Sequence, residues 1–187
     1  GRWFGGSLRP VSAADLASGL LRGLIERTEL DPAEVDEVIL GNCNPTNEAP
    51  AIGRVVALDA GLPITTTGQQ LDRRCGSGLQ AILTAAGQIA TGGSRLVLAG
   101  GTESMSRAPY LLPRAREGYR LGHGELLDSI LTDGLTDVFH RYHMGMTAEN
   151  LAELHRAIPQ VSQRTLTRQL RELEDDGILG RVVFPEV

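Results

Sequence analysis

The chain has 187 residues, a mass of 20.0 kDa, a formal net charge of −5, and 41% hydrophobic and 22% charged residues. This length allows one substantial hydrophobic core, or one medium domain with a small appendage, and excludes a large multidomain protein. The negative charge gives no global reason to expect a nucleic acid or an anionic membrane as a partner, although a local basic surface is compatible with it.

The composition also argues against several kinds of site. No stretch approaches the about 18 consecutive apolar residues of a membrane span, and no leader for export is visible, so we expect a soluble, cytoplasmic protein. Cys43 and Cys75 are the only cysteines, too few for a disulfide scaffold or a four-thiolate zinc site. All 18 basic residues are Arg, which leaves no lysine for Schiff-base chemistry.

The first expected element is an amphipathic helix over residues 12–27, with Ser12 as a plausible N-cap. We expect this helix to pack against a sheet. The apolar side chains of the expected packing face are Leu16, Leu20 and Leu24.

The following segments alternate between strand-like and helix-like patterns. Strands are expected at residues 38–41, 65–71 and 96–99, and helices at 47–61 and 78–90. The second of these helices carries an apolar stripe at three- and four-residue spacings, formed by Leu79, Ile82, Leu83, Ala86 and Ile89. Short connections between alternating strands and helices predict an α/β layered fold.

Regular patterning then stops over residues 104–146, which are rich in Pro, Gly, Arg and Tyr. A long irregular excursion within a compact chain is usually functional or partly disordered. Helical patterning resumes at Leu151, and a further helix is expected over 162–176 before an extended segment at 180–187.

The strongest candidate for chemistry is Cys75, in the stretch RRCGSGLQA between a strand-like segment and the helix that opens around Ser77 or Gly78. The positive end of the helix dipole favours the thiolate, which is the nucleophilic form. Gly76 and Gly78 leave room for an incoming electrophile and permit a sharp strand-to-helix turn, whose N–H groups could hold an oxyanion. A buried free cysteine in a tight turn explains the spacing equally well.

Other candidate residues have weaker support. Cys43 follows a strand without an adjoining helix start, which favours an ordinary free thiol. His140 and His143 have a spacing that metal sites use, but only Asp137 lies nearby as a further ligand, so we expect no metal.

Several ordered motifs resemble the thiolases, the acetyl-CoA acetyltransferases. RRCGSGLQA is similar to their acyl-enzyme cysteine motif, and GGTESMS at residues 100–106 is similar to their second signature. FGGSL near the start, EVILGN at 37–42 and YHMGMTAEN at 142–150 extend the resemblance over about residues 1–155.

The resemblance implies acyl transfer on coenzyme A thioesters, with Cys75 as the nucleophile and no further cofactor. His143 and Met144 fall where thiolases line the pantetheine tunnel. Residues 104–146 match the family's loop domain over the CoA, and its arginines could meet phosphates or simply form a solvated surface. These are Arg114, Arg116 and Arg120.

The resemblance also implies a homo-oligomer, because thiolases assemble through their amino-terminal halves. The family's second half supplies a Gly-His-Pro histidine and a second catalytic cysteine, and neither occurs in the 187 residues. We therefore expect the first half of a thiolase-like fold, without its opening strand, and incomplete catalysis.

Residues 156–187 resemble part of a winged-helix transcriptional regulator of the HxlR type, which makes DNA an alternative partner. Leu166, Leu170 and Leu173 form an apolar stripe, and on roughly the opposite face lie three arginines that could meet phosphates or guanine edges. These are Arg164, Arg168 and Arg171. An ordinary amphipathic surface helix is the alternative interpretation.

Overall fold

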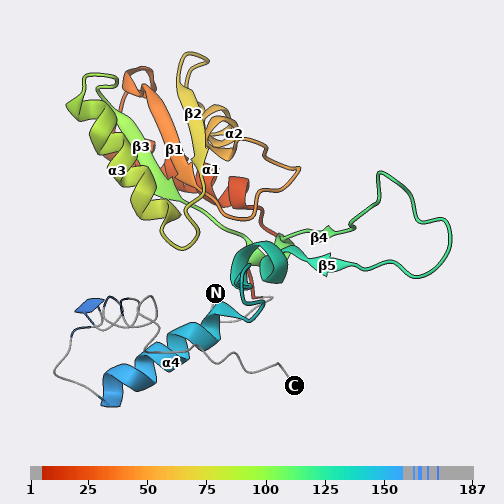
Figure 1. Cartoon of the computed structure of the whole chain (residues 1–187). Helices are drawn as coiled ribbons and strands as arrows, with labels where there is room; N and C mark the ends of the chain where they lie inside the picture. The colour runs from red at the N-terminus through yellow and green to blue at the C-terminus, as the bar shows by residue number, and fades with distance from the viewer. Residues whose placement is uncertain (1–5, 158–161, 163, 166–167, 169–171, 173–187) are drawn as a thin grey trace. The chain divides into compact units, whose positions relative to one another are not determined.

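The computed structural model describes residues 6–157, 162, 164, 165, 168 and 172. The chain divides into two compact units, Gly1–Ile130 and Leu131–Val187 (Figure 1). The first unit contains the expected alternation of strands and helices, and the second begins within the irregular excursion of residues 104–146. Each unit is described by itself.

Three parallel strands form the central sheet of the first unit in the order β2-β1-β3. They are β1 (Glu37–Gly41), β2 (Thr67–Leu71) and β3 (Val97–Gly101). Glu37 is in register with Thr67 on one side and with Val97 on the other, so the strands end together at one edge. The predicted strands are confirmed, and β3 continues through Gly100 and Gly101 where the sequence suggested a stop.

Two crossover helices connect the strands, as parallel pairing requires. They are α2 (Ile52–Asp59), between β1 and β2, and α3 (Ser77–Ala90), between β2 and β3. The expected helix at 47–61 is shorter than predicted, because α2 begins only at Ile52 after a left-handed residue, Ala51. A short 3₁₀ turn, Pro32–Glu34, leads into β1.

Helix α1 (Ala13–Thr28) begins as predicted, with the Ser12 Oγ accepting a hydrogen bond from the Asp15 N–H at 3.0 Å. The predicted packing face was wrong in part, because Leu20 is 69% exposed. The helix instead buries Ala17, Ser18 and Leu21. Small side chains let the helix approach its neighbours closely, and this rotates the leucine row partly toward solvent.

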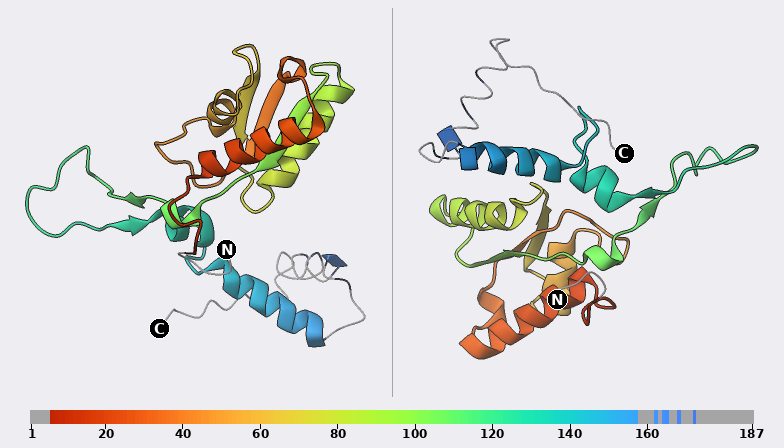
Figure 2. Two further views of the ribbon diagram at one scale, coloured as in Figure 1. Left: turned by 180° about the vertical axis from the view of Figure 1, so that it is seen from behind. Right: turned by 90° about the horizontal axis from the view of Figure 1, so that it is seen from below.

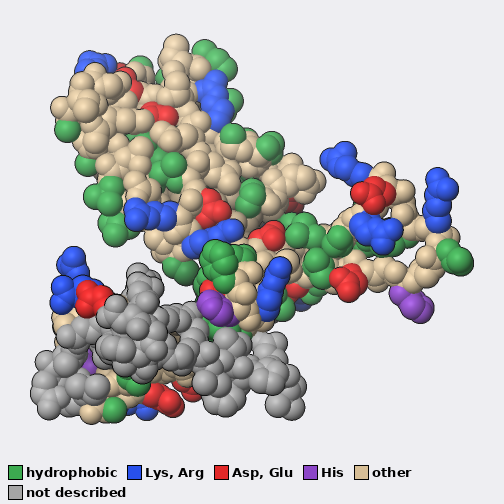
Figure 3. Space-filling view, in the orientation of Figure 1, with side chains coloured by type: hydrophobic (Ala, Val, Ile, Leu, Met, Phe, Trp, Pro, Cys, Tyr) green, Lys and Arg blue, Asp and Glu red, His purple; other side chains and the backbone are tan. Residues whose placement is uncertain are grey.

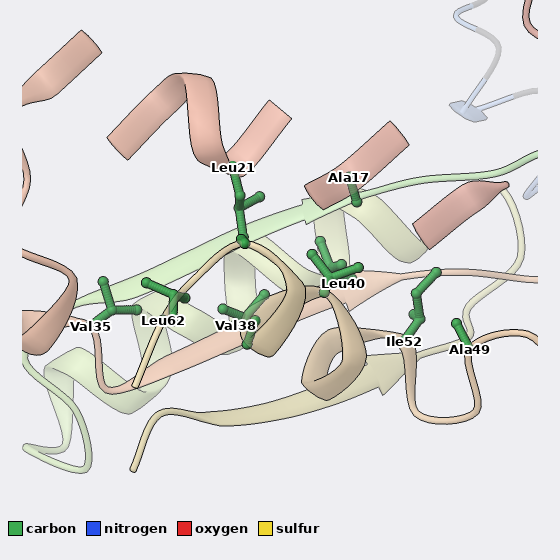
Figure 4. Close-up of a cluster of buried hydrophobic side chains, with 11 residues drawn as sticks. Ala17, Leu21, Val35, Val38, Leu40, Ala49, Ile52 and Leu62 are labelled. Atoms are coloured by element: carbon green, nitrogen blue, oxygen red, sulfur yellow. The ribbon is translucent and has the colours of Figure 1, made fainter. Parts of the chain in front are cut away.

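Helices cover both faces of the sheet, α1 and α2 on one and α3 on the other (Figures 1 and 2). The larger core cluster joins α1 and α2 to Val38 and Leu40 of β1 (Figure 4). Ile39 points to the opposite face, against Ala81 and Ala85 of α3. The alternation of side chains along β1 therefore builds both layers.

Helix α3 packs on the sheet through small residues and leaves its large apolar residues exposed. Ser77, Ala81 and Ala85 are buried. Four members of the predicted apolar stripe are exposed to different extents, namely Leu79 at 64%, Ile82 at 53%, Leu83 at 55% and Ile89 at 47%. Figure 3 shows hydrophobic side chains along the surface over α3.

The excursion after β3 contains only short elements, as predicted. They are a 3₁₀ turn (Met105–Arg107), the antiparallel pair β4 (Tyr110–Leu111) and β5 (Leu127–Asp128), and a π-helix (Ile130–Leu135). Helix α4 (Met144–Ala157) begins earlier than the predicted Leu151. Among the helices of the described residues, none has the length and apolar character needed to cross a membrane.

Candidate active site

Three loops meet at the edge where the parallel strands end. Residues 42–44 follow β1, residues 72–76 follow β2 and residues 102–104 follow β3. In open α/β sheets, ligands bind outside the carboxyl ends of the strands. This edge therefore holds the candidate active site, and both cysteines of the chain lie on it.

Cys75 occupies a tight turn between β2 and α3, and the residue is exposed. Gly76 is the N-cap of α3, so the thiol lies directly before the positive end of this helix. The Gly76 N–H donates to the Arg73 carbonyl at 3.0 Å, and the Ser77 N–H donates to the Arg74 carbonyl at 2.9 Å. The strand-to-helix turn at Cys75 is as the sequence predicted, and the residue within it is exposed to solvent.

The residue before the thiol has an uncommon backbone conformation. Arg74 has a φ of 49°, in the left-handed region that non-glycine residues rarely adopt. Its N–H donates to the Asp72 Oδ1 at 2.9 Å, and its guanidinium pairs with the same carboxylate at 3.2 Å. Such conformations persist where the surrounding contacts fix them, and they concentrate at functional sites.

Ser77 provides much of that fixation from inside the turn. It is 4% exposed, its Oγ accepts from the Arg73 N–H at 2.8 Å, and it donates to the Arg74 carbonyl at 2.6 Å. One hydroxyl thus acts as acceptor and donor at once, and it joins the start of α3 to both Arg73 and Arg74. The sequence predicts a helix start around Ser77 or Gly78, and the structure shows it at Ser77, which has this further role in the turn.

The glycines around the turn have different functions. Gly76 has φ −92° and ψ 0°, and a Cβ placed there would lie 3.3 Å from the Arg73 carbonyl oxygen. A Cβ at Gly78 would meet nothing within 4 Å, which agrees with open space beside the thiol turn. The closest packing is at Gly41, where a Cβ would lie 2.7 Å from the Gly78 nitrogen. The missing side chain at Gly41 therefore lets the start of α3 approach the end of β1.

Cys43, in the loop after β1, packs against the turn that carries Cys75. Its Sγ is 3.1 Å from the Arg74 carbonyl oxygen, to which it donates, and 3.3 Å from the Ser77 Oγ. Burial is the main cause that raises the pKa of the Cys43 thiol above its ordinary value, and the nearby Glu103 carboxylate adds to the effect. Cys43 is therefore a neutral hydrogen-bond donor near neutral pH, which suits a supporting residue.

Sequence reasoning missed Glu103, which binds the loop after β1. Its Oε2 accepts from the Cys43 N–H at 2.7 Å, and its Oε1 accepts from the Asn44 N–H at 3.2 Å and from the Asn42 Nδ2 at 2.9 Å. The available signal was a carboxylate directly after a strand, at the edge where parallel strands end. Its partners lie about 60 positions away in sequence, so spacing alone could not identify them.

The residues predicted to contact CoA belong to different parts of the chain. His143 and Met144 lie in the second unit at the start of α4, where the His143 Nδ1 accepts from the Gly145 N–H at 3.0 Å. Three predicted phosphate contacts lie between β4 and β5 in the first unit, and all are exposed: Arg114, Arg116 and Arg120. Their assignment to CoA stays a prediction.

The second unit also contains the histidine pair that was considered for metal binding. His140 Nδ1 is 3.1 Å from the Asp137 Oδ1, which also accepts from the backbone N–H groups of His140 and Phe139. Within the described residues, no group of three or more His, Cys, Asp or Glu side chains is placed to hold a metal ion.

The described residues include two of the three arginines of the predicted DNA-binding face. Arg171 and residues 173–187 lie outside them, whereas Arg164 and Arg168 are described. The Arg168 Nε is 3.8 Å from the Glu172 Oε1, an exposed pair of ordinary surface type. The winged-helix interpretation of residues 156–187 stays a prediction without structural support.

Comparisons with known proteins find similar curated enzymes. The chain is 46% identical over 150 residues to the "Probable acetyl-CoA acyltransferase" of Staphylococcus aureus (strain COL), and 47% identical over 150 residues to the "Acetyl-CoA acetyltransferase" of Pseudomonas aeruginosa strain PAO1. Each alignment covers 80% of this chain and 38% of the relative, so the chain spans well under half the length of these curated relatives.

A solved structure shows the same fold. The crystal structure of the Bacillus anthracis acetyl-CoA acetyltransferase superposes with a TM-score of 0.77 at 46% identity, covering 82% of this chain and 39% of that one. The family model described as "Thiolase, N-terminal domain" matches residues 1–165. By sequence and by fold, the chain therefore belongs to the thiolase family and corresponds to its N-terminal domain.

Proposed function

We propose that the chain is an acyltransferase of the thiolase type, which takes an acyl group from a coenzyme A thioester onto Cys75. The observation that carries this proposal is the exposed Cys75 thiol, held before the N-terminus of α3 by a turn with a left-handed residue at Arg74. Two relatives are named as a probable acetyl-CoA acyltransferase and an acetyl-CoA acetyltransferase, and these names support the choice of substrate class.

The proposed step is a transthioesterification. The Cys75 thiolate attacks the carbonyl carbon of the thioester, the new carbon–sulfur bond forms, and the CoA thiolate leaves and takes up a proton from water. The N–H groups of Gly76 and Ser77 already donate to the Arg73 and Arg74 carbonyls. The N–H groups of the first turn of α3 beyond Ser77 are therefore the proposed donors to the negative oxygen of the tetrahedral intermediate. His143 and Met144 are proposed contacts of the pantetheine arm.

We further propose that these 187 residues alone stop at the acyl-enzyme. The resemblance assigns activation of the nucleophile to a Gly-His-Pro histidine, and transfer of the substrate α-proton to a catalytic cysteine that follows later in the chain. No Gly-His-Pro and no cysteine after Cys75 occur in this sequence. Without a positioned base, a proton-transfer step loses a factor of about 10² to 10⁴.

The test is the intact mass of the purified chain after incubation with acetyl-CoA. We expect a gain of one acetyl group in the parent chain and in Cys43→Ser, and none in Cys75→Ala. A soluble parent chain that gains nothing would contradict acyl transfer to Cys75. Steady-state thiolysis of acetoacetyl-CoA at the rate of a complete thiolase would contradict the proposed stop at the acyl-enzyme.

We also propose that the chain self-associates through the first unit. Helix α3 contains no charged residue in its 14 positions, and its outward stripe is exposed. A helix that is apolar on its outer side is normally covered by another element. Two copies of this face could meet without repulsion between like charges, which favours a second copy of the chain as the occupant.

A further inference from the structure

The turn that carries Cys75 needs external support, because its conformation is costly by itself. A non-glycine residue in the left-handed region is strained, and the surrounding contacts must hold it there. Arg74 is the strained residue, and it directly precedes Cys75. Any relaxation of the Arg74 backbone therefore reorients the Cys75 thiol.

The Arg74 carbonyl receives three hydrogen bonds that hold this conformation. The donors are the Ser77 N–H at 2.9 Å, the Ser77 Oγ at 2.6 Å and the Cys43 Sγ at 3.1 Å. The first two come from the turn itself. The third comes from the loop after β1, and it is effective only if Cys43 stays in place.

Glu103 keeps Cys43 in place from the end of the third strand. Its two carboxylate oxygens accept the N–H groups of Cys43 and Asn44 at 2.7 and 3.2 Å, and the half-buried position makes these charge-assisted bonds stronger than neutral ones. The Asn42 side chain, which is 2% exposed, adds a donor to Glu103 at 2.9 Å and one to the Thr102 carbonyl at 3.1 Å.

We infer that Glu103 is a positioning residue, which orients the Cys75 thiol through the connected path Glu103, Cys43 and Arg74. The path links the ends of all three parallel strands. Through it, the contact of the Glu103 carboxylate after β3 fixes the orientation of the Cys75 thiol after β2. Glu103 itself makes no contact with the acyl group in this scheme. The catalytic role of Glu103 rests on the proposed function. Its effect on the orientation of the Cys75 thiol can be tested by alkylation, without a thioester.

The experiment measures two rates at Cys75 by mass spectrometry, alkylation by iodoacetamide and acetylation by acetyl-CoA. Glu103→Gln keeps the size of the side chain but removes the charge and one acceptor. Cys43→Ala removes the thiol donor, and Cys43→Ser retains a donor. The matched control is Glu37→Gln, which alters a carboxylate at the opposite end of β1 that accepts from the Gln69 Nε2 at 3.2 Å.

We expect Glu103→Gln and Cys43→Ala to slow both reactions at Cys75 about three- to tenfold, in line with the loss of one hydrogen bond to a charged or strained group. Cys43→Ser should restore the parent rate, and Glu37→Gln should leave it unchanged. The double variant should be no slower than either single variant, because both changes break one path. A purely structural role for the two residues would give additive losses and no recovery with Ser.

Parent rates in a folded Glu103→Gln variant, or additive losses in the double variant, would overturn the inference. Should Glu103→Gln fail to fold, Glu103→Asp retains the charge and withdraws the carboxylate by one methylene, and parent rates in that variant would overturn it equally. If the alkylation rates of the parent and the variants follow the expected pattern but the parent is never acetylated, the proposed function fails while the positioning role of Glu103 stands.

Discussion

The two thiols at the edge of the sheet differ in their surroundings, and this difference predicts their reactivity. Cys75 is exposed, whereas Cys43 is half-buried against Ser77, and burial raises the pKa of the Cys43 thiol. Since the thiolate is the form that alkylates, iodoacetamide at about pH 8 should label Cys75 well before Cys43. Peptide mapping of a labelling time course measures the order.

A denatured sample provides the control for this labelling, because both thiols should then react at similar rates. Equal labelling rates of Cys43 and Cys75 in the native chain would show that Cys43 is accessible in solution, in contradiction to this prediction. Labelling of Cys43 should continue to rise to a higher pH than that of an ordinary thiol, because its raised pKa moves the formation of thiolate upward.

The contact between Gly41 and the start of α3 predicts an intolerance to any side chain. A Cβ at Gly41 would lie 2.6 Å from the Ser77 carbonyl carbon, which is backbone and cannot rotate away. Gly41→Ala should therefore destabilise the first unit by about 1–3 kcal/mol, as overpacking does elsewhere, and displace the Cys75 turn. Chemical denaturation measures the first effect, and the alkylation rate of Cys75 measures the second.

Gly100→Ala is the matched control, because Gly100 lies on the neighbouring strand in register with Leu40 and a Cβ there meets nothing within 4 Å. We expect this variant to retain the stability and the thiol reactivity of the parent. Equal destabilisation by both substitutions would show that strand propensity, and not the contact with α3, sets the cost.

At the level of single residues, the sequence identified the candidate nucleophile but not its support. Cys75 was identifiable because a thiol, two glycines and a helix start are adjacent in sequence, and local spacing carries that information. Glu103 and Cys43 act across about 60 positions, where only the strand order brings them together. The left-handed conformation falls on Arg74 and not on a neighbouring glycine, which no propensity rule indicates.

Among the elements, the starts of β1 and β3 are joined by a single carboxylate whose effect depends on pH. The Asp36 Oδ2 accepts from the Arg95 N–H at 2.6 Å and from the Leu96 N–H at 3.1 Å. These bonds lower the pKa of Asp36 below its ordinary value, with the Arg95 N–H as the largest cause. Because the folded pKa is depressed, the stabilisation is present above the ordinary pKa of aspartate and is lost as the pH falls through the lower folded value.

Asp36→Asn should therefore lower the melting temperature at neutral pH, and the difference from the parent should shrink below about pH 4. Thermal denaturation across a pH series measures this convergence. Glu34→Gln, which removes an exposed charge two positions earlier, is the control and should follow the parent throughout. A difference between Asp36→Asn and the parent that persists undiminished in acid would contradict a role for the ionised carboxylate.

The helices and strands of the first unit were predicted well, and their packing faces less well. The alternation of apolar runs and turn residues fixed the three strands and α1 and α3 to within a few positions. The packing faces depended on small residues that a hydrophobic pattern ignores. Ala81 and Ala85 lie on the sheet while Leu83 is exposed, and Ala17 is buried while Leu20 is exposed, because close approach of a helix to a sheet favours small side chains.

For the whole molecule, the outward stripe of α3 predicts concentration-dependent association. The stripe consists of Leu79, Ile82, Leu83 and Ile89 on a helix without charges. Burying one such side chain contributes about 1.5–3 kcal/mol, so covering the stripe gives a clear driving force for pairing. We expect the mean mass of the chain, measured by light scattering after size-exclusion chromatography, to rise with concentration.

Leu83→Glu should weaken this association at least about tenfold, since a charge in the centre of an apolar interface costs more than the about 1.4 kcal/mol that this factor represents. The matched control is Leu20→Glu, the same substitution at a leucine of α1 that is 69% exposed, compared with 55% for Leu83. We expect Leu20→Glu to associate like the parent, because α1 carries charges along its outer side. A parent chain that stays monomeric at every concentration would contradict the prediction, and equal loss in both variants would place the contact elsewhere than on α3.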